Sequence, residues 1–94
     1  MLITSPQNPR IKDLVRLRDR RGRDRDQKVI IEGYRELMRA VDAGYPLEEL
    51  YVCPELFQGS NEPALIERCC RAGAALFETP PAVFGKVAYR DRPE

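Results

Sequence analysis

The chain has 94 residues, a net charge of +1, a hydrophobic content of 43% and a charged content of 33%, values that are typical of one small globular domain. Its longest apolar runs, Val29–Ile31 and Ala74–Phe77, are strand-sized, whereas a bilayer span needs roughly 20 apolar residues, so we expect no membrane partner. The N-terminus lacks the basic segment and apolar core of a secretory signal, which indicates a cytoplasmic protein.

The chain contains no histidine and three cysteines. This excludes the common zinc patterns, histidine-based catalytic triads and an imidazole general base, so we expect no metal site. Cys69 and Cys70 are adjacent, which is a poor geometry for a disulfide, and Cys53 leaves an odd count. We therefore expect three reduced thiols that pack as small hydrophobic side chains.

The first element expected along the chain is a basic helix that begins at Asn8 and Pro9 and ends at Gly22, because Asn caps helices, Pro favours their first turn and Gly stops them. At about 100° per residue, one face of this helix is apolar and carries Ile11, Leu14, Val15 and Leu17. The opposite face is cationic and carries Lys12, Arg16, Arg20 and Arg23.

Positive charge is concentrated in residues 1–35, which carry ten Lys or Arg and five Asp or Glu, whereas residues 36–94 carry six and ten. Residues 16–25 alone contain six arginines. Arginine suits bidentate contacts with phosphate, so the segregated cationic face predicts a nucleic-acid partner. The alternative is a solvated helix whose arginines pair with the acidic residues threaded through it, which are Asp13, Asp19, Asp24 and Asp26.

After a loop at residues 23–27, short β-branched runs alternate with helical periodicity. We expect strands at residues 28–31, 50–53 and 74–78. We expect helices at residues 34–43 and 61–72, each stopped by the following glycine, and a last short helix, capped by Thr79-Pro80, that contains Val83, Phe84 and Val87. This alternation predicts an α/β fold with a parallel or mostly parallel sheet, followed by a polar tail at residues 89–94.

The junction Glu32-Gly33-Tyr34-Arg35 lies where the first expected strand ends and a helix begins. Open α/β sheets commonly bind ligands at such ends, Gly33 permits close approach of a sugar-phosphate, and Arg35 adds a cation. The alternative is that Gly33 is only a tight turn and that Arg35 lies on the solvent face. No glycine-rich phosphate loop strengthens the ligand interpretation.

Two further groups of residues are interpreted as structural. Phe57, Phe77 and Phe84 follow core periodicity and are not interleaved with basic residues, so a platform for stacking bases is disfavoured and recognition of folded RNA through phosphates and shape fits better. Glu48 and Glu49 are consecutive and therefore point to different sides, which does not favour a catalytic pair of carboxylates.

The ordered motifs of the chain extend this interpretation. They are Ser5-x-x-Asn8-Pro9-x-Ile11-Lys12-x-Leu14-x-x-Leu17, an Arg-rich segment, Ile31-Glu32-Gly33-x-Arg35-x-x-x-x-Ala40, then Gly44, Leu50-x-Val52, Phe84-x-Lys86 and Tyr89-Arg90-Asp91-x-Pro93. In this order they closely resemble the N-terminal substrate-binding domain of the SpoU/TrmH family of RNA 2'-O-ribose methyltransferases. Ala88 departs from the pattern, because relatives usually have a small hydroxylic residue there.

The resemblance implies a three-layer α/β/α sandwich similar to the kink-turn-binding ribosomal proteins, preceded by the basic helix. It implies an RNA substrate-binding domain at residues 1–88 and, at residues 89–94, the start of a linker to a C-terminal catalytic domain that this chain lacks. The full-length protein would use S-adenosylmethionine and form a homodimer through the missing domain. The family's cofactor and catalytic motifs are not found in the 94 residues, so we expect this chain alone to contain no catalytic residue and no cofactor.

We therefore expect a domain that recruits structured RNA, either rRNA or tRNA, for methylation. The residues expected to contact RNA are Asn8, Lys12, Arg16, Arg20, Arg23, Glu32, Gly33 and Arg35. One alternative is a protein-interaction or assembly domain whose arginines are only solvated and salt-bridged. Another is a free-standing ribosomal-type RNA-binding protein with no enzyme attached.

Overall fold

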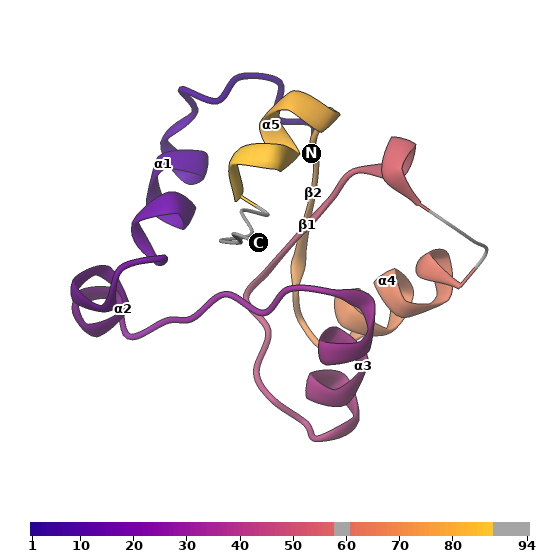
Figure 1. The fold of residues 1–94 in the computed structure, drawn as a ribbon. Coiled ribbons are helices and arrows are strands. Elements are labelled where there is room, and N and C mark those ends of the chain that lie inside the picture. Colours follow the sequence, from indigo (N-terminus) through magenta and orange to yellow (C-terminus); the bar gives the residue numbers. More distant parts are fainter. Residues whose placement is uncertain (58–60, 88–94) are drawn as a thin grey trace, which may run out of the picture.

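Helices and short strands alternate in the computed structural model, which describes residues 1–57 and 61–87 (Figure 1). The α-helices within these ranges are α1 (Pro9–Arg16), α2 (Arg20–Asp26), α3 (Tyr34–Asp42), α4 (Glu62–Arg71) and α5 (Pro81–Val87). The strands are β1 (Glu49–Val52) and β2 (Ala75–Glu78), and a short 3-10 helix, η1 (Pro54–Leu56), follows β1. The predicted mixed α/β class is confirmed.

Strands β1 and β2 pair in parallel, with Glu49 opposite Ala75 and Val52 opposite Glu78. Helix α4 lies between them in the chain and makes the crossover that a parallel pair requires. Residues 1–3 extend the sheet beside β2, since the Ile3 N–H donates to the Glu78 carbonyl at 2.8 Å and the Glu78 N–H donates to the Met1 carbonyl at 2.7 Å. The parallel sheet is as predicted, and the pairing of the N-terminus with β2 is an addition to it.

Two hydrophobic clusters lie on the two faces of this sheet, because successive strand residues point to opposite sides. Tyr51 and Phe77 pack into the first cluster with buried residues of α1 and α5. Leu50 and Val52 belong to the second cluster, which α3 and α4 complete with Leu37, Met38, Leu65 and Cys69. Figure 1 shows α1 and α5 on one side of the strands and α3 and α4 on the other.

The single basic helix predicted from Asn8 to Gly22 is wrong in its length. Helix α1 ends at Arg16, a turn follows, and a second helix, α2, begins at Arg20 and continues through the segment expected to be a loop. Gly22 is buried inside α2 instead of ending a helix. The predicted apolar face is confirmed, since Ile11 and Leu17 are buried and Leu14 and Val15 pack against the first cluster.

The strand predicted at Lys28–Ile31 does not form. This segment has no strand pairing, and the side chain of Val29 is 68% exposed. Together with β1 and α4, the segment lines an apolar cavity of about 1050 Å³. Ile30 and Ile31 belong to this lining and are half-buried. Because β propensity describes the fit of a side chain to a paired sheet surface, a β-branched run without a partner strand stays irregular.

The remaining elements follow the predicted order. Helices α3, α4 and α5 and strands β1 and β2 lie where expected to within a few residues. Thr79 differs in its role, because its buried hydroxyl donates to the Val52 carbonyl at 3.1 Å and so ties the end of β2 to β1. The predicted tail at residues 89–94 and the domain boundary at residue 88 lie outside the described residues.

Within the described ranges, the longest helix has ten residues, and no helix is long and apolar enough to cross a membrane. The three thiols are free, with Cys53 and Cys69 buried and Cys70 exposed. Burial raises the pKa of the Cys69 thiol. Cys53 and Cys69 thus pack as expected, whereas Cys70 lies on the surface of α4.

Candidate nucleic-acid interface

Helix α1 begins as the sequence predicts, with the Asn8 side chain accepting a hydrogen bond from the Arg10 N–H at 2.9 Å. This cap fixes the helix start, and Ile11, which is 1% exposed, anchors the first turn in the core. Lys12 therefore lies on the exposed side of α1. Asn8 acts in the structure as a capping residue, and its contact with RNA stays a prediction.

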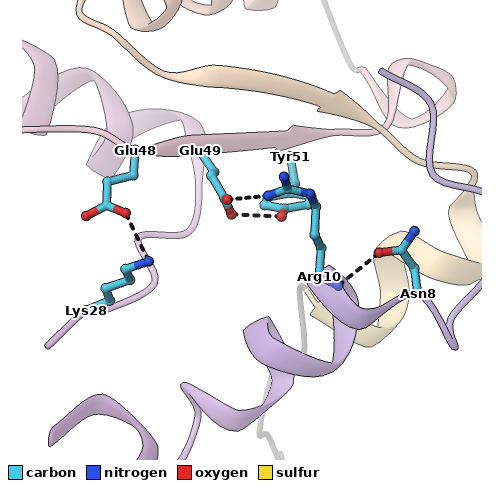
Figure 2. A network of polar contacts seen from close by, with 6 residues as sticks. All are labelled: Asn8, Arg10, Lys28, Glu48, Glu49 and Tyr51. Atoms are coloured by element: carbon cyan, nitrogen blue, oxygen red, sulfur yellow. Dashed lines mark hydrogen bonds and ion pairs between the residues drawn. The ribbon is translucent and has the colours of Figure 1, made fainter. Parts of the chain in front are cut away.

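Arg10 ties α1 to the sheet (Figure 2). Its guanidinium pairs with the Glu49 carboxylate at 2.6 Å, and its central carbon lies 4.6 Å from the centre of the Phe77 ring. The Tyr51 hydroxyl donates to the same carboxylate at 2.8 Å, and the Tyr51 and Phe77 rings stack with centroids 5.0 Å apart. The basic helix is thereby held to both strands by one side chain.

Partial burial of Tyr51 raises the pKa of its phenol well above the ordinary value, and the neighbouring Glu49 carboxylate adds to the shift. The phenol therefore stays protonated and remains a hydrogen-bond donor to Glu49 throughout the physiological range. Glu48, next in the chain, points elsewhere and pairs with Lys28 at 3.0 Å, which raises the pKa of Lys28 (Figure 2). The two carboxylates thus pair with different cations, which agrees with the prediction that they point to different sides.

The arginine-rich segment forms the exposed surface of α1 and α2. Three of its arginines pair with acidic neighbours, namely Arg16 with Asp13, Arg20 with Asp24 at 3.8 Å and Arg25 with Asp26 at 3.3 Å. Pairs this exposed contribute about 0–1 kcal/mol each, so their arginines can exchange a carboxylate for a phosphate. Lys12 and Arg21 make no ion pair with any residue in the described part of the chain.

Arg23 has a different environment from the other predicted contact residues. It is half-buried, and its guanidinium donates to the carbonyls of Leu17 and Arg18 at 3.1 Å and 2.7 Å. These carbonyls belong to the turn between α1 and α2, where helix termini leave acceptors unpaired. The contact of Arg23 with phosphate stays a prediction, and the structure adds an internal role for its side chain.

A polar pocket of about 300 Å³ lies beside α1 and is lined by residues from α1, the end of α2 and β1. Its charged lining residues are Arg10, Asp13, Arg16, Arg25, Asp26, Lys28 and Glu49, and its apolar ones are Leu14 and Leu17. The cations in this lining already pair with carboxylates. The pocket therefore offers both donors and acceptors to a polar ligand.

The second predicted group of contact residues lies at the start of α3. Gly33 precedes the helix with a φ of 98°, which glycine adopts readily, and its carbonyl accepts from the Leu37 N–H at 3.0 Å. Glu32 is half-buried, whereas Arg35 is exposed and forms no ion pair among residues 1–57 and 61–87. Gly33 thus supplies a positive φ at the start of α3, but the strand expected before it does not form.

The structure does not bring the two groups together. Helix α1 packs against α5 on one face of the sheet, whereas α3 packs against α4 on the other. Arg39 pairs with Glu36 at 3.4 Å and Asp42 pairs with Arg68, so the charges of α3 are largely matched. The cations of α1 and α2 thus form one candidate surface, and Arg35 a separate one.

Sequence reasoning missed the roles of two residues that support this surface. Arg10 was not assigned a role, although its position two residues after the cap places it at the start of a helix that packs on the sheet. Gly22 was assigned to a helix end. Its close approach to the Arg16 backbone depends on the turn between α1 and α2, which the sequence pattern did not predict. A local pattern carries no signal for either contact.

Residues 8–94 match the family model described as the MRM3-like substrate binding domain. The match covers nearly the whole chain, and the chain belongs to this family. None of the curated proteins compared with the chain matches it significantly. The resemblance expected from the sequence is confirmed at the level of a methyltransferase substrate-binding domain.

Proposed function

We propose that the chain binds structured RNA and presents it to the catalytic domain of a 2'-O-ribose methyltransferase. The observation that carries this proposal is a surface rich in arginine, formed by α1 and α2, in a member of a substrate-binding family. The residues on it that we expect to contact RNA are Asn8, Lys12, Arg16, Arg20 and Arg23, and the exposed Arg21 adds a further cation. Glu32, Gly33 and Arg35 would make a second, smaller contact.

Phosphate is the chemical group that suits this surface best. Arginine offers a fork of N–H donors that fits two phosphate oxygens, and each bound phosphate releases condensed counterions from the nucleic acid. The ion pairs of Arg16 and Arg20 are solvent-exposed, so exchanging their carboxylate partners for phosphate costs little free energy. Phe77 is buried and stacks with Tyr51, so this ring is not available for base stacking.

Several finer features belong to the same proposal. Helices on both sides of the sheet are compatible with a three-layer α/β/α sandwich like that of kink-turn-binding ribosomal proteins. The substrate would be rRNA or tRNA, and the full-length protein would be a cytoplasmic homodimer. A domain at residues 1–88 followed by a linker is the corresponding domain arrangement.

S-adenosylmethionine is the methyl donor that this class of reaction uses. Among the described residues, the lining of the polar pocket beside α1 has no aromatic side chain to hold an adenine ring, and its cations pair with carboxylates. Following the resemblance to the methyltransferase family, we assign the cofactor site to the proposed catalytic domain and derive no methyl-transfer step from the residues of this chain.

The test is a titration of the chain with labelled rRNA fragments and tRNA at several salt concentrations, with duplex DNA of equal length as the control. We expect affinity for structured RNA to fall with salt along a log-log slope of about −0.7 to −0.9 per phosphate contacted. Absence of binding at low salt would contradict the proposal. Equal affinity for RNA and DNA would contradict the proposed preference for RNA.

A protein-interaction domain is the second candidate, and the pairing of Asp13, Asp24 and Asp26 with arginines favours it. Size-exclusion chromatography with and without nuclease treatment separates the two candidates. Nucleic acid that co-elutes and is removed by nuclease supports RNA binding. A discrete oligomer of protein alone that survives high salt supports the interaction domain.

A further inference from the structure

We propose that Gly22 and Arg23 are positioning residues that lock α1 and α2 into a fixed corner, so that the cations of both helices engage one RNA backbone as a unit. This inference rests on the proposed function and adds to it a geometric requirement. The ligand is a bent or folded ribose-phosphate backbone whose phosphates contact α1 and α2 together.

Gly22 lets the two helices approach closely. It is buried within α2, and a Cβ added to it would lie 2.0 Å from the Arg16 carbonyl oxygen and 2.8 Å from the Arg16 carbonyl carbon. Both atoms belong to the backbone at the end of α1, so the clash cannot be relieved by rotating a side chain. Any larger residue at position 22 must push α2 away from α1.

Arg23 closes the same corner from the neighbouring position. Its guanidinium nitrogen donates to the Leu17 and Arg18 carbonyls at 3.1 Å and 2.7 Å, in a partly buried setting. The C-terminal end of α1 carries a partial negative charge, which a cation stabilises. One side chain of α2 thus satisfies the acceptors of the turn that follows α1.

A fixed corner changes how the arginines bind. Arg16 on α1 and Arg20 on α2 have exposed side chains on either side of the turn. If the corner is held before binding, the entropy of ordering it is not lost when RNA binds, and several phosphates are contacted together. If the corner is loose, each cation binds on its own and the salt slope reports fewer simultaneous contacts.

Gly22→Ala is the decisive variant, because it changes no charge and alanine is the better helix former. We expect it to weaken RNA binding about tenfold and to make the salt slope shallower by at least one contact, about 0.7 to 0.9. A surface that binds by charge alone would keep both quantities unchanged. Unchanged affinity and slope in a folded Gly22→Ala chain would overturn the inference while leaving the proposed function intact.

Arg23→Gln and Arg21→Gln form a matched pair on the same helix. Both remove one positive charge, but Arg21 is exposed and Arg23 bonds the turn. We expect Arg21→Gln to remove one phosphate contact from the salt slope and to lower the affinity for RNA about two- to threefold. We expect Arg23→Gln to remove more than one phosphate contact and to lower the affinity about tenfold. Equal losses in affinity and slope would show that Arg23 acts only as another phosphate contact.

The folding of each variant is checked by far-ultraviolet circular dichroism and by its melting temperature. RNA binding is measured for each variant whose spectrum matches that of the parent chain. A variant that lowers the melting temperature and leaves affinity and slope unchanged has only a structural role, which contradicts the inference. If Gly22→Ala does not fold, the pair at positions 21 and 23 decides the question. If the parent chain itself binds no RNA, the proposed function fails first.

Discussion

The Arg10 guanidinium on α1 lies 2.6 Å from the Glu49 carboxylate on β1 (Figure 2). The central carbon of the same guanidinium lies 4.6 Å from the centre of the Phe77 ring on β2. Arg10, which belongs to the basic N-terminal part of the chain, is thereby bound to the sheet. This contact orients helix α1, which carries Lys12 and Arg16. The charge of the N-terminal half thus divides between cations that build the fold and cations that remain on the surface.

The coupling between Arg10 and Glu49 can be measured with a double-mutant cycle. We expect Arg10→Ala to lower the free energy of unfolding by about 1–2 kcal/mol, since it removes both the ion pair and the cation–π contact. The coupling energy with Glu49→Ala should be about 0.5–1 kcal/mol, because both side chains are partly exposed. Urea unfolding of the parent, the two single variants and the double variant gives these values. Additive effects would show that the pair contributes nothing.

The raised pKa of Tyr51 predicts that the stability of the chain depends on pH in the alkaline range. Its native pKa is raised by burial and by Glu49, whereas the unfolded phenol titrates near pH 10. The native state therefore holds the proton more tightly, and this contribution to stability is present below about pH 10 and is lost as the pH rises toward the native pKa. We expect melting temperature above pH 10 to fall more steeply in the parent chain than in Tyr51→Phe. Parallel curves would contradict the assigned contact.

Val29 and Ile11 test the revised fold of the N-terminal half. Val29 is 68% exposed and Ile11 is 1% exposed. We expect Val29→Ala to change the free energy of unfolding by less than about 0.5 kcal/mol and Ile11→Val to lower it by about 0.5–1.5 kcal/mol. Chemical denaturation measures both. A large loss from Val29→Ala would indicate that the segment is a packed strand after all.

Calorimetry of the chain with S-adenosylmethionine tests the assignment of the cofactor site. Methyl transfer needs a pocket that holds the sulfonium and aligns it with the attacking ribose oxygen. We expect no saturable binding heat and, in parallel, no transfer of a radiolabelled methyl group to total RNA. Stoichiometric binding would place a cofactor site in this chain and overturn the assignment.

The sequence predicted the elements whose signals are local. Asn8 and Pro9 mark the start of α1, Gly33 precedes α3, and the periodic apolar residues of α4 are those that the core buries. A cap, a positive φ and a buried helix face are all properties of a few neighbouring residues, so the pattern alone identifies them.

The failures depend on contacts between distant or non-periodic residues. Gly22 reads as a helix stop, but its proximity to the Arg16 carbonyl shows that it serves a close approach between two short helices. The β-branched residues before Glu32 have the composition of a strand, yet pairing requires a free partner edge that composition does not reveal. For the candidate site, the sequence predicted the cations Lys12, Arg16, Arg20 and Arg23 on one face of a single helix, whereas the structure divides them between α1 and α2. The bonds of Arg23 to the turn follow only from the position of that turn.

Charge reversal on two matched surfaces tests the central claim most directly. Arg16→Glu with Arg20→Glu changes the surface of α1 and α2, and Arg68→Glu with Arg71→Glu makes the same change in net charge on α4, where both arginines are also exposed and paired with carboxylates. We predict that the first double variant lowers affinity for structured rRNA by about 100-fold or more and loses about two contacts from the salt slope, whereas the second lowers affinity less than about fivefold. Equal losses from the two surfaces, or binding unchanged by the first, would contradict the account.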